Sequence, residues 1–313
     1  MSLRLPPENV LWAVGGIFTI LVVASVVVRL MARGRPEVRT SELALRVRSW
    51  WAMAAVFSVA VVVGRGVSIG FLGFVSFLAF KEYLSLIPTR RADRRVLLLA
   101  YLAIPLQFWW VADAWYGMFL IFIPVYVFLL LPLRMVTIGE TTGFLKAVGT
   151  LHWGLMTTVF SLSHAAYLLA LPAETNPAGG GAGLLLYLVF LTQAGDVSQY
   201  LWGKAVGRRR VVPKVSPNKT WGGLVGGALT TTALAALLAP LLTPLDLPLA
   251  VGAGALIGVA GFFGDVTISA VKRDLGVKDS GALLPGHGGI LDRVDSLTYT
   301  APLFFHYVYY FVY

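Results

Sequence analysis

The sequence predicts an all-α protein that crosses a membrane about ten times. Hydrophobic residues make up 58% of the 313 residues and charged residues only 13%, whereas a soluble domain usually carries about 25% charged residues. The apolar residues form continuous runs of roughly 20, the length of a membrane-spanning helix, and not the roughly 10-residue alternating strands of a barrel. The chain has no cysteine, which excludes disulfides and cysteine-bound metals.

Ten apolar runs are the predicted spans. Their ranges are 9–31, 50–64, 66–87, 96–112, 115–133, 147–171, 184–203, 221–241, 248–270 and 297–313. Gly64-Arg65-Gly66 separates the second run from the third, which leaves open one broken helix with a re-entrant piece. The last run is short and aromatic, as in an interfacial belt. Because the first run lacks a clear small-residue cleavage site, we expect a retained span and not a signal peptide.

Basic residues gather in alternate loops. Most of the 25 lysines and arginines follow the first, third, fifth, seventh and ninth runs, whereas the other loops hold Arg65 and little else. Cytoplasmic loops carry such an excess, so the pattern predicts that these loops lie in the cytoplasm and both termini outside. The membrane that we expect is the bacterial inner membrane. Loop basicity also accounts for the net charge of +10, so we expect no nucleic acid as partner.

The connector 172–183 divides the chain. It contains two prolines and three consecutive glycines, a composition typical of a flexible connector. We therefore expect an N-terminal transmembrane bundle at 1–171 and a C-terminal catalytic transmembrane domain at 184–313.

The segment 269–295 interrupts the apolar pattern with charge and glycine. Its acids and bases are Asp274, Asp279, Asp292, Asp295, Lys272, Arg273, Lys278 and Arg293. Asp265 lies just upstream and shares roughly one helix face with Ser269 and Lys272. Carboxylates that converge with Asp265 would hold Mg²⁺, and the basic side chains would neutralise a polyphosphate.

Glycine surrounds a histidine in the same segment, at Pro285-Gly286-His287-Gly288-Gly289. Glycines allow backbone amides to approach a ligand closely. His287 has three readings: proton transfer, donation to a phosphate, or a structural role in a tight turn. Asp292 and Asp295 are three residues apart and would be neighbours on a helix.

Two upstream features extend the candidate site. Asp196 lies within a predicted span, where a carboxylate costs about 2.5–3.5 kcal/mol and is functional by default; a helix-packing role is the alternative. The segment 214–223 starts the eighth span after Pro217, and its anion-binding candidates are Lys214, Ser216, Lys219 and Thr220. Free amides at a helix start favour anions, although an ordinary capped helix explains this segment equally well. The glycines at 222–227 indicate close helix packing.

These motifs resemble a known enzyme family. The fixed residues of the long segment are Ser269, Val271-Lys272-Arg273, Lys278-Asp279, Gly281, Leu284-Pro285, His287-Gly288-Gly289-Ile290 and Asp292-Arg293-Val294-Asp295. This pattern resembles the signature of the phosphatidate cytidylyltransferases (CDP-diacylglycerol synthases). Two further patterns resemble the family in the expected order, Asp196 with Tyr200 and Gly203-Lys204, and Ser216-Pro217 with Lys219-Thr220-Trp221. The resemblance covers roughly 185–305, and Phe80-Lys81-Glu82-Tyr83 is similar to an element often found in the N-terminal part.

The resemblance implies that phosphatidic acid and CTP give CDP-diacylglycerol and pyrophosphate. It implies Mg²⁺, with a second, monovalent cation as an open addition, and CTP, phosphatidic acid or a related lipid phosphate, membrane lipids and a second copy of the chain as partners. Catalytic residues would be Asp265, Asp292, Lys272 and His287. Metal ligands would be Asp265 and Asp292, then Asp196 and Asp295. Substrate-binding residues would be Lys214, Ser216, Lys219, Thr220, Arg273, Lys278, Asp279 and Arg293.

Some positions depart from that family. Gly222 and Ile268 stand where the family commonly has acids, and Val197 and Gln199 replace small or hydroxyl residues. Another lipid phosphate acceptor or altered metal use therefore stays open. So do two other functions: a CTP-dependent polyprenol kinase, and a lipid or ion transporter with Asp196 and Asp265 as coupling residues. The concentration of polar residues in the C-terminal half speaks against a transporter built from related halves.

Overall fold

A computed structural model describes residues 6–34, 42–88, 90, 93–281, 283 and 288–313. Over these residues the predicted all-α fold is confirmed: no β-strand is found there, and Arg210 and Thr220 form an isolated bridge. The α-helices are α1 (Glu8–Gly34), α2 (Glu42–Val63), α3 (Arg65–Leu86), α4 (Arg94–Ala112), α5 (Tyr116–Ile121), α6 (Phe128–Val136), α7 (Phe144–Leu155), α8 (Ser161–Tyr167), α9 (Gly180–Val206), α10 (Trp221–Leu242), α11 (Leu247–Asp274), α12 (Leu291–Val294) and α13 (Leu297–Phe311).

Two π-helical segments join neighbouring helices, η3 (Phe122–Val127) between α5 and α6, and η4 (Met156–Phe160) between α7 and α8. Among the described residues, eight helices are long and apolar enough to cross a membrane: Glu8–Arg33, Leu43–Val63, Arg65–Leu86, Arg94–Ala112, Tyr116–Val136, Gly180–Val206, Trp221–Leu242 and Leu247–Asp274. The other two predicted spans are also helical: α13 is only 15 residues long, and residues 144–167 form α7, η4 and α8. The chain is therefore an integral membrane protein of helices.

The second and third predicted spans are two separate helices. Gly64 lies between α2 and α3 with a φ of 137°, a conformation that costs glycine little and other residues much. The side chain of Ser68 then donates to the carbonyl oxygen of Ala60 at 2.8 Å across the turn. The helix α2 begins at Glu42 and so includes Arg46 and Arg48, which the span prediction left in a loop.

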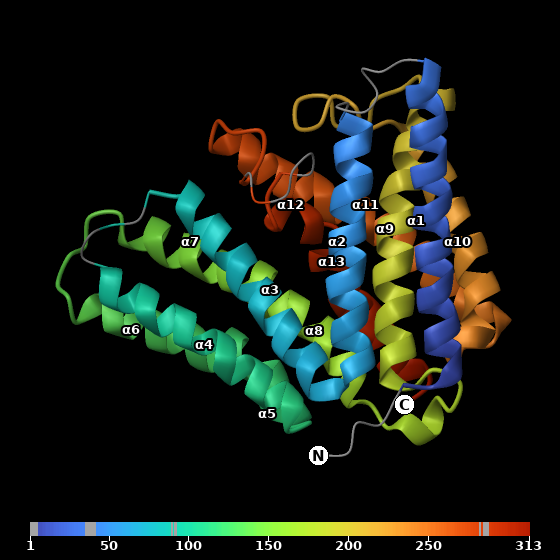
Figure 1. Ribbon diagram of the computed structural model, residues 1–313. Helices are drawn as coiled ribbons and strands as arrows, with labels where there is room; N and C mark the ends of the chain where they lie inside the picture. The colour runs from blue at the N-terminus through green and yellow to red at the C-terminus, as the bar shows by residue number, and fades with distance from the viewer. Residues whose placement is uncertain (1–5, 35–41, 89, 91–92, 282, 284–287) are drawn as a thin grey trace.

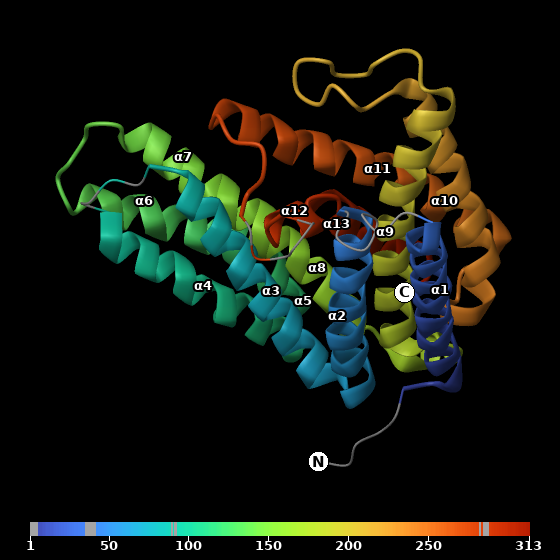
Figure 2. The same ribbon diagram turned by 45° about the horizontal axis from the view of Figure 1, so that its top comes forward.

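The helices form two groups joined by the C-terminal elements. In Figures 1 and 2, α1, α2, α9 and α10 run side by side, while α3 to α8 form a tilted group beside them. The helices α12 and α13 lie between the groups, where α12 contacts α3 and α13 packs against α8, α9 and α11. Phe119 and Phe305 meet in this region with ring centroids 5.9 Å apart. One apolar core therefore spans both predicted halves of the chain.

The connector at 172–183 is closely packed. Its last four residues are already helical, because α9 begins at Gly180. The side chain of Asn176 is buried and donates to the carbonyl oxygens of Gly180 at 2.7 Å and Leu242 at 3.0 Å. A Cβ on Gly179 or Gly183 would collide with the carbonyl oxygen of Leu242. The expected flexible connector is therefore wrong for this segment, since its glycines serve close packing against the end of α10.

Glycines also bring α9, α10 and α11 together. A Cβ on Gly223 or Gly227 would collide with Gln199 of α9, and a Cβ on Gly258 would lie 2.8 Å from the Cα of Ala228. The packing role predicted for the glycines of α10 is confirmed. Small residues let membrane helices approach closely. The backbones of α9, α10 and α11, which carry or adjoin the polar candidate site residues, are therefore in close contact.

Candidate active site

Lys219 and Asp265 form an ion pair between the start of α10 and the middle of α11. Their Nζ and Oδ2 atoms are 2.6 Å apart. The same ammonium group donates to Gln199 Oε1 at 3.2 Å, and Ser269 Oγ donates to Asp265 Oδ1 at 3.1 Å. Burial disfavours the charged amine, but Asp265 and Asp196 outweigh this effect and raise the pKa of Lys219. Lys219 is therefore a fixed cation that is directed at carboxylates of the site.

Three carboxylates from three elements influence one another here. Asp196 Oδ1 accepts from Ser296 Oγ at 2.9 Å, and Asp295 Oδ1 accepts from the Ser296 amide at 2.7 Å. Burial, followed by the charges of Asp265 and Asp196, raises the pKa of Asp295 well above its usual value. The three carboxylates disfavour one another's charged forms, and a bound cation would relieve this repulsion.

A second ion pair joins Lys272 of α11 to Asp292 of α12. Lys272 Nζ lies 2.6 Å from Asp292 Oδ1, and the two residues are 9% and 7% exposed. Asp292 Oδ2 accepts from the amides of Ser280 at 2.8 Å and Gly289 at 3.0 Å. Burial acts to raise the pKa of Asp292, but Lys272 and these amides outweigh it and lower the pKa.

The glycine pair of the signature segment serves this arrangement. Gly288 has a φ of 79°, and a Cβ there would collide with Asp292 Oδ2. Gly289 donates its amide to that same oxygen. We expected these glycines to let backbone amides approach a ligand, and in the structure the group approached is the carboxylate of Asp292.

Glu82 enters the site from the N-terminal half of the chain. Its Oε1 atom accepts from the amide of Ile290 at 2.9 Å. Its Oε2 atom accepts from the amide of Leu291 at 2.9 Å and from Ser280 Oγ at 3.1 Å. One carboxylate of α3 thus binds both ends of the segment between 280 and 291.

The remaining predicted residues lie around these pairs. Lys214, Arg273, Lys278 and Asp279 are exposed, and Ser216 and Arg293 are partly buried. Arg273 links α11 to the α9–α10 connection, since its Nε donates to the carbonyl oxygen of Val215 at 3.3 Å. Thr220 Oγ1 accepts from the Gly223 amide at 3.1 Å and so caps α10. His287 lies outside the described residues.

The fit of a divalent cation depends on the donors that are free. Among the described residues, no three Asp, Glu, His or Cys side chains are grouped to hold a metal together, so the four predicted ligands do not form one set. Mg²⁺ is commonly held by one or two carboxylates with waters and substrate phosphates. A carboxylate has about four lone-pair sites. The described contacts fill three of them at Asp292, two at Asp265 and one each at Asp196 and Asp295, so the last three residues fit that chemistry better than Asp292.

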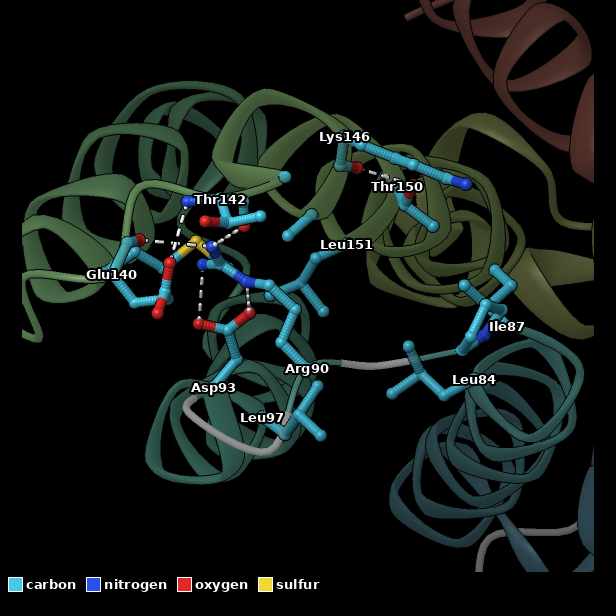
Figure 3. A pocket seen from close by; sticks show the side chains of 14 residues that line it. Leu84, Ile87, Arg90, Asp93, Leu97, Glu140, Thr142, Lys146, Thr150 and Leu151 are labelled. Atoms are coloured by element: carbon cyan, nitrogen blue, oxygen red, sulfur yellow. Dashed lines mark hydrogen bonds and ion pairs between the residues drawn. The ribbon is translucent and has the colours of Figure 1, made fainter.

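A hollow of about 480 Å³ lies apart from these pairs, between the ends of α3, α4, α6 and α7 (Figure 3). Arg90 donates to both oxygens of the buried Asp93 and to the carbonyl oxygens of Glu140 and Thr142. Leu84, Leu97 and Leu151 line the apolar wall. Since Arg90 joins two connections, its role here is to hold the ends of these helices together.

Sequence reasoning missed several partners. Gln199 appeared as a departure from a family pattern, but it holds Lys219 and donates to the carbonyl oxygen of Gly258 at 3.1 Å. Ser280 carried no signal beyond its place in the charged segment, and Ser296 lies just after that segment. Glu82 was visible within Phe80-Lys81-Glu82-Tyr83, although nothing in the spacing related it to residue 280 or 290.

Comparisons with known proteins relate the chain to a family of enzymes. A family model described as the cytidylyltransferase family matches residues 44–311. The chain is 47% identical over 297 residues to the uncharacterized protein YnbB of Escherichia coli (strain K12), a match that covers 95% of this chain and 97% of that protein.

Shorter matches relate the chain to proteins named phosphatidate cytidylyltransferase. The Haemophilus influenzae protein is 42% identical over 153 residues, which cover 46% of this chain and 51% of that protein. The Pseudomonas aeruginosa protein is 47% identical over 124 residues, which cover 39% of this chain and 46% of that protein. The chain spans about half the length of these two relatives.

Proposed function

This chain belongs to the cytidylyltransferase family, and we propose that it transfers a cytidylyl group from CTP to a lipid phosphate at the membrane surface. The proposed acceptor is phosphatidic acid, and the products are CDP-diacylglycerol and pyrophosphate. The observation that carries this proposal is the paired arrangement of Lys219 with Asp265 and Lys272 with Asp292, at the end of helices otherwise suited to a membrane. Relatives named phosphatidate cytidylyltransferase support the choice of acceptor.

The reaction forms one bond and breaks one bond. A phosphate oxygen of the lipid attacks the α-phosphorus of CTP, and the bond from that phosphorus to the oxygen of the β-phosphate breaks. Pyrophosphate leaves with the electron pair, so no nucleophile from the protein is required. Catalysis then depends on positioning and on stabilising the negative charge that develops on the leaving group.

Exposed cations would bind the phosphates of both substrates. Lys214, Arg273 and Lys278 are exposed at the same end of α10 and α11 and provide this charge. The buried pair of Lys272 and Asp292 would fix the segment that carries Arg293. Lys219 is held by Asp265 and Gln199, so its positive charge is fixed beside the carboxylate of Asp265 and orients that group.

We propose Mg²⁺ as the cofactor, held by Asp265 with Asp196 or Asp295. When bound, it would act as a Lewis acid toward the phosphate groups of CTP. The protein's own part is to present these carboxylates from α9, α11 and the α12–α13 connection, with Ser269 and Ser296 orienting two of them. We place this site on the cytoplasmic side of a bacterial inner membrane, since CTP is a cytoplasmic nucleotide and the basic loops favour that side.

The acceptor is the part of the proposal that most needs a test. Purified protein in detergent would be incubated with Mg²⁺, α-labelled CTP and either phosphatidic acid or a polyprenol. We expect label in the lipid phase with phosphatidic acid, and none with Asp265→Asn. A parallel reaction would contain γ-labelled CTP. If the polyprenol acquired label from γ-labelled CTP and no lipid acquired label from α-labelled CTP, the protein would be a kinase and the proposal would be wrong. Light scattering in detergent would test the homodimer that the family resemblance implies.

A further inference from the structure

Two carboxylates bind Ser280 and the stretch from Gly289 to Leu291. Asp292 accepts from the amides of Ser280 and Gly289, and Glu82 accepts from the amides of Ile290 and Leu291 and from the hydroxyl of Ser280. Ser280 is the shared element, because its amide binds one carboxylate and its hydroxyl binds the other. It is itself buried, at 4% exposed.

Glu82 belongs to a part of the chain that lies far from the site in sequence. It comes from α3, about 200 residues before its partners, whereas Asp265, Lys272 and Asp292 belong to the C-terminal half. A Cβ on Gly289 would collide with Glu82 Oε2, and a Cβ on Gly281 would lie 3.0 Å from Oε1. Two glycines of the signature segment thus make room for this one side chain.

The contacts are of a kind that fixes geometry. Hydrogen bonds from amides to a carboxylate are short and roughly twice as strong as those between neutral groups. Losing such an acceptor leaves buried donors unpaired, which is more harmful than losing an exposed contact. Ile290 and Leu291 begin α12, so the position of Glu82 is transmitted directly to Asp292 in the first turn of that helix.

We propose that Glu82 is a positioning residue for cytidylyl transfer: it holds the start of α12 so that Asp292 and Lys272 keep their reactive placement. This inference rests on the function proposed above. It makes the N-terminal bundle part of the active site, and it gives Phe80-Lys81-Glu82-Tyr83 a defined role. Glu82 touches backbone and Ser280, so it acts through other groups and not on the substrate.

The test compares Glu82→Gln with Glu174→Gln, the same chemical change at an exposed carboxylate. For Glu82→Gln we expect kcat to fall at least about tenfold, since small displacements in an active site are costly, while KM for CTP changes less than about threefold. The thermal midpoint should fall modestly below that of Glu174→Gln, because buried donors lose their acceptor, while the protein stays folded at the assay temperature. A lower kcat with a nearly unchanged KM, in a protein that is still folded, indicates a positioning role. An unchanged kcat would overturn the proposal.

A second variant protects the test against misfolding. Ser280→Ala removes one hydroxyl partner and should lower kcat by a smaller factor. Because both changes break the same contact, Glu82→Gln with Ser280→Ala should be hardly worse than Glu82→Gln alone. Fully multiplicative losses would show that the two residues act independently and would contradict the proposal.

Limited trypsin digestion gives a readout that needs no activity. Lys278 is exposed beside the held segment, and Arg208 is an exposed reference site on the α9–α10 connection. We expect Glu82→Gln to speed cleavage after Lys278 relative to cleavage after Arg208, and Glu174→Gln to leave the ratio unchanged. If the wild-type protein transfers no cytidylyl group, the proposed function fails, but this ratio still decides whether Glu82 holds the segment. An unchanged ratio would overturn that role.

Discussion

Lys272 and Asp292 form a buried ion pair, with 2.6 Å between Nζ and Oδ1. Asp292 also accepts hydrogen bonds from the amides of Ser280 and Gly289, whereas the ammonium group of Lys272 donates to Asp292. Removing one partner of a buried pair leaves an uncompensated charge, which typically costs about 3–5 kcal/mol. The pair therefore couples the stability of the α11–α12 region to its function.

The Lys272→Met and Asp292→Asn variants test this coupling. Each should lower the thermal midpoint in detergent and abolish labelled lipid, and the double variant should unfold at a midpoint no lower than Asp292→Asn alone. The reason is that the double variant leaves no unpaired charge. Thermal unfolding followed by circular dichroism measures all three. Additive losses of stability would show that the two side chains do not interact.

Asp265 should matter for chemistry more than for folding. Asp265→Asn keeps the size of the side chain and its hydrogen bond from Ser269, but it removes the charge opposite Lys219. We expect at least about a hundredfold loss of turnover, in the range found when a preorganised charged group is removed, with normal insertion and purification.

The matched control for Asp265→Asn is Asp113→Asn, the same change at an exposed position after α4. Its turnover should equal that of wild type. Comparable turnover of the two variants would remove Asp265 from the active site.

Thr220 should affect stability through its cap. Thr220→Ala removes the acceptor for the Gly223 amide at the start of α10, a loss that typically costs about 0.5–2 kcal/mol. Thr220→Ser keeps the oxygen and should unfold near the wild-type midpoint. Equal midpoints for the alanine and serine variants would argue that the hydroxyl does not cap the helix.

Two glycine substitutions should shift stability in opposite directions. Gly227→Ala places a methyl group against Gln199 of α9, and such overpacking typically costs about 1–3 kcal/mol. Gly149→Ala, on α7, meets open space and should stabilise slightly by restricting the unfolded chain. Thermal midpoints in the same detergent compare them, and a stabilising Gly227→Ala would contradict the close packing of α9 on α10.

The fold was predictable because the bilayer imposes it. Continuous apolar runs must become helices when no water can satisfy the backbone. Gly64-Arg65-Gly66 marked a boundary between the second and third runs, although the sequence left open one broken helix with a re-entrant piece. The packed connector at 172–183 was not predictable, since glycines in a turn and glycines in a tight contact look alike in sequence. The close approach of Gly179 and Gly183 to Leu242 depends on the tertiary structure.

The site was predictable where helix periodicity governs it. Asp265 and Ser269 were expected on one face, and the structure joins them by a hydrogen bond. Periodicity cannot reveal which distant partner a charge chooses. Lys272 shares that face but pairs with Asp292, while Asp265 pairs with Lys219. The contacts of Glu82 are the hardest to predict in this way, because its partners lie about 200 residues away in sequence.

The most direct measurement of the central claim is the fate of both ends of CTP in one reaction. Purified protein with Mg²⁺ and phosphatidic acid would receive CTP labelled at the α and γ positions. We predict that the α label enters the lipid and the γ label leaves as pyrophosphate in equal amounts. The γ label in lipid with release of CDP, or no label in lipid at all while the protein is folded, would contradict the account.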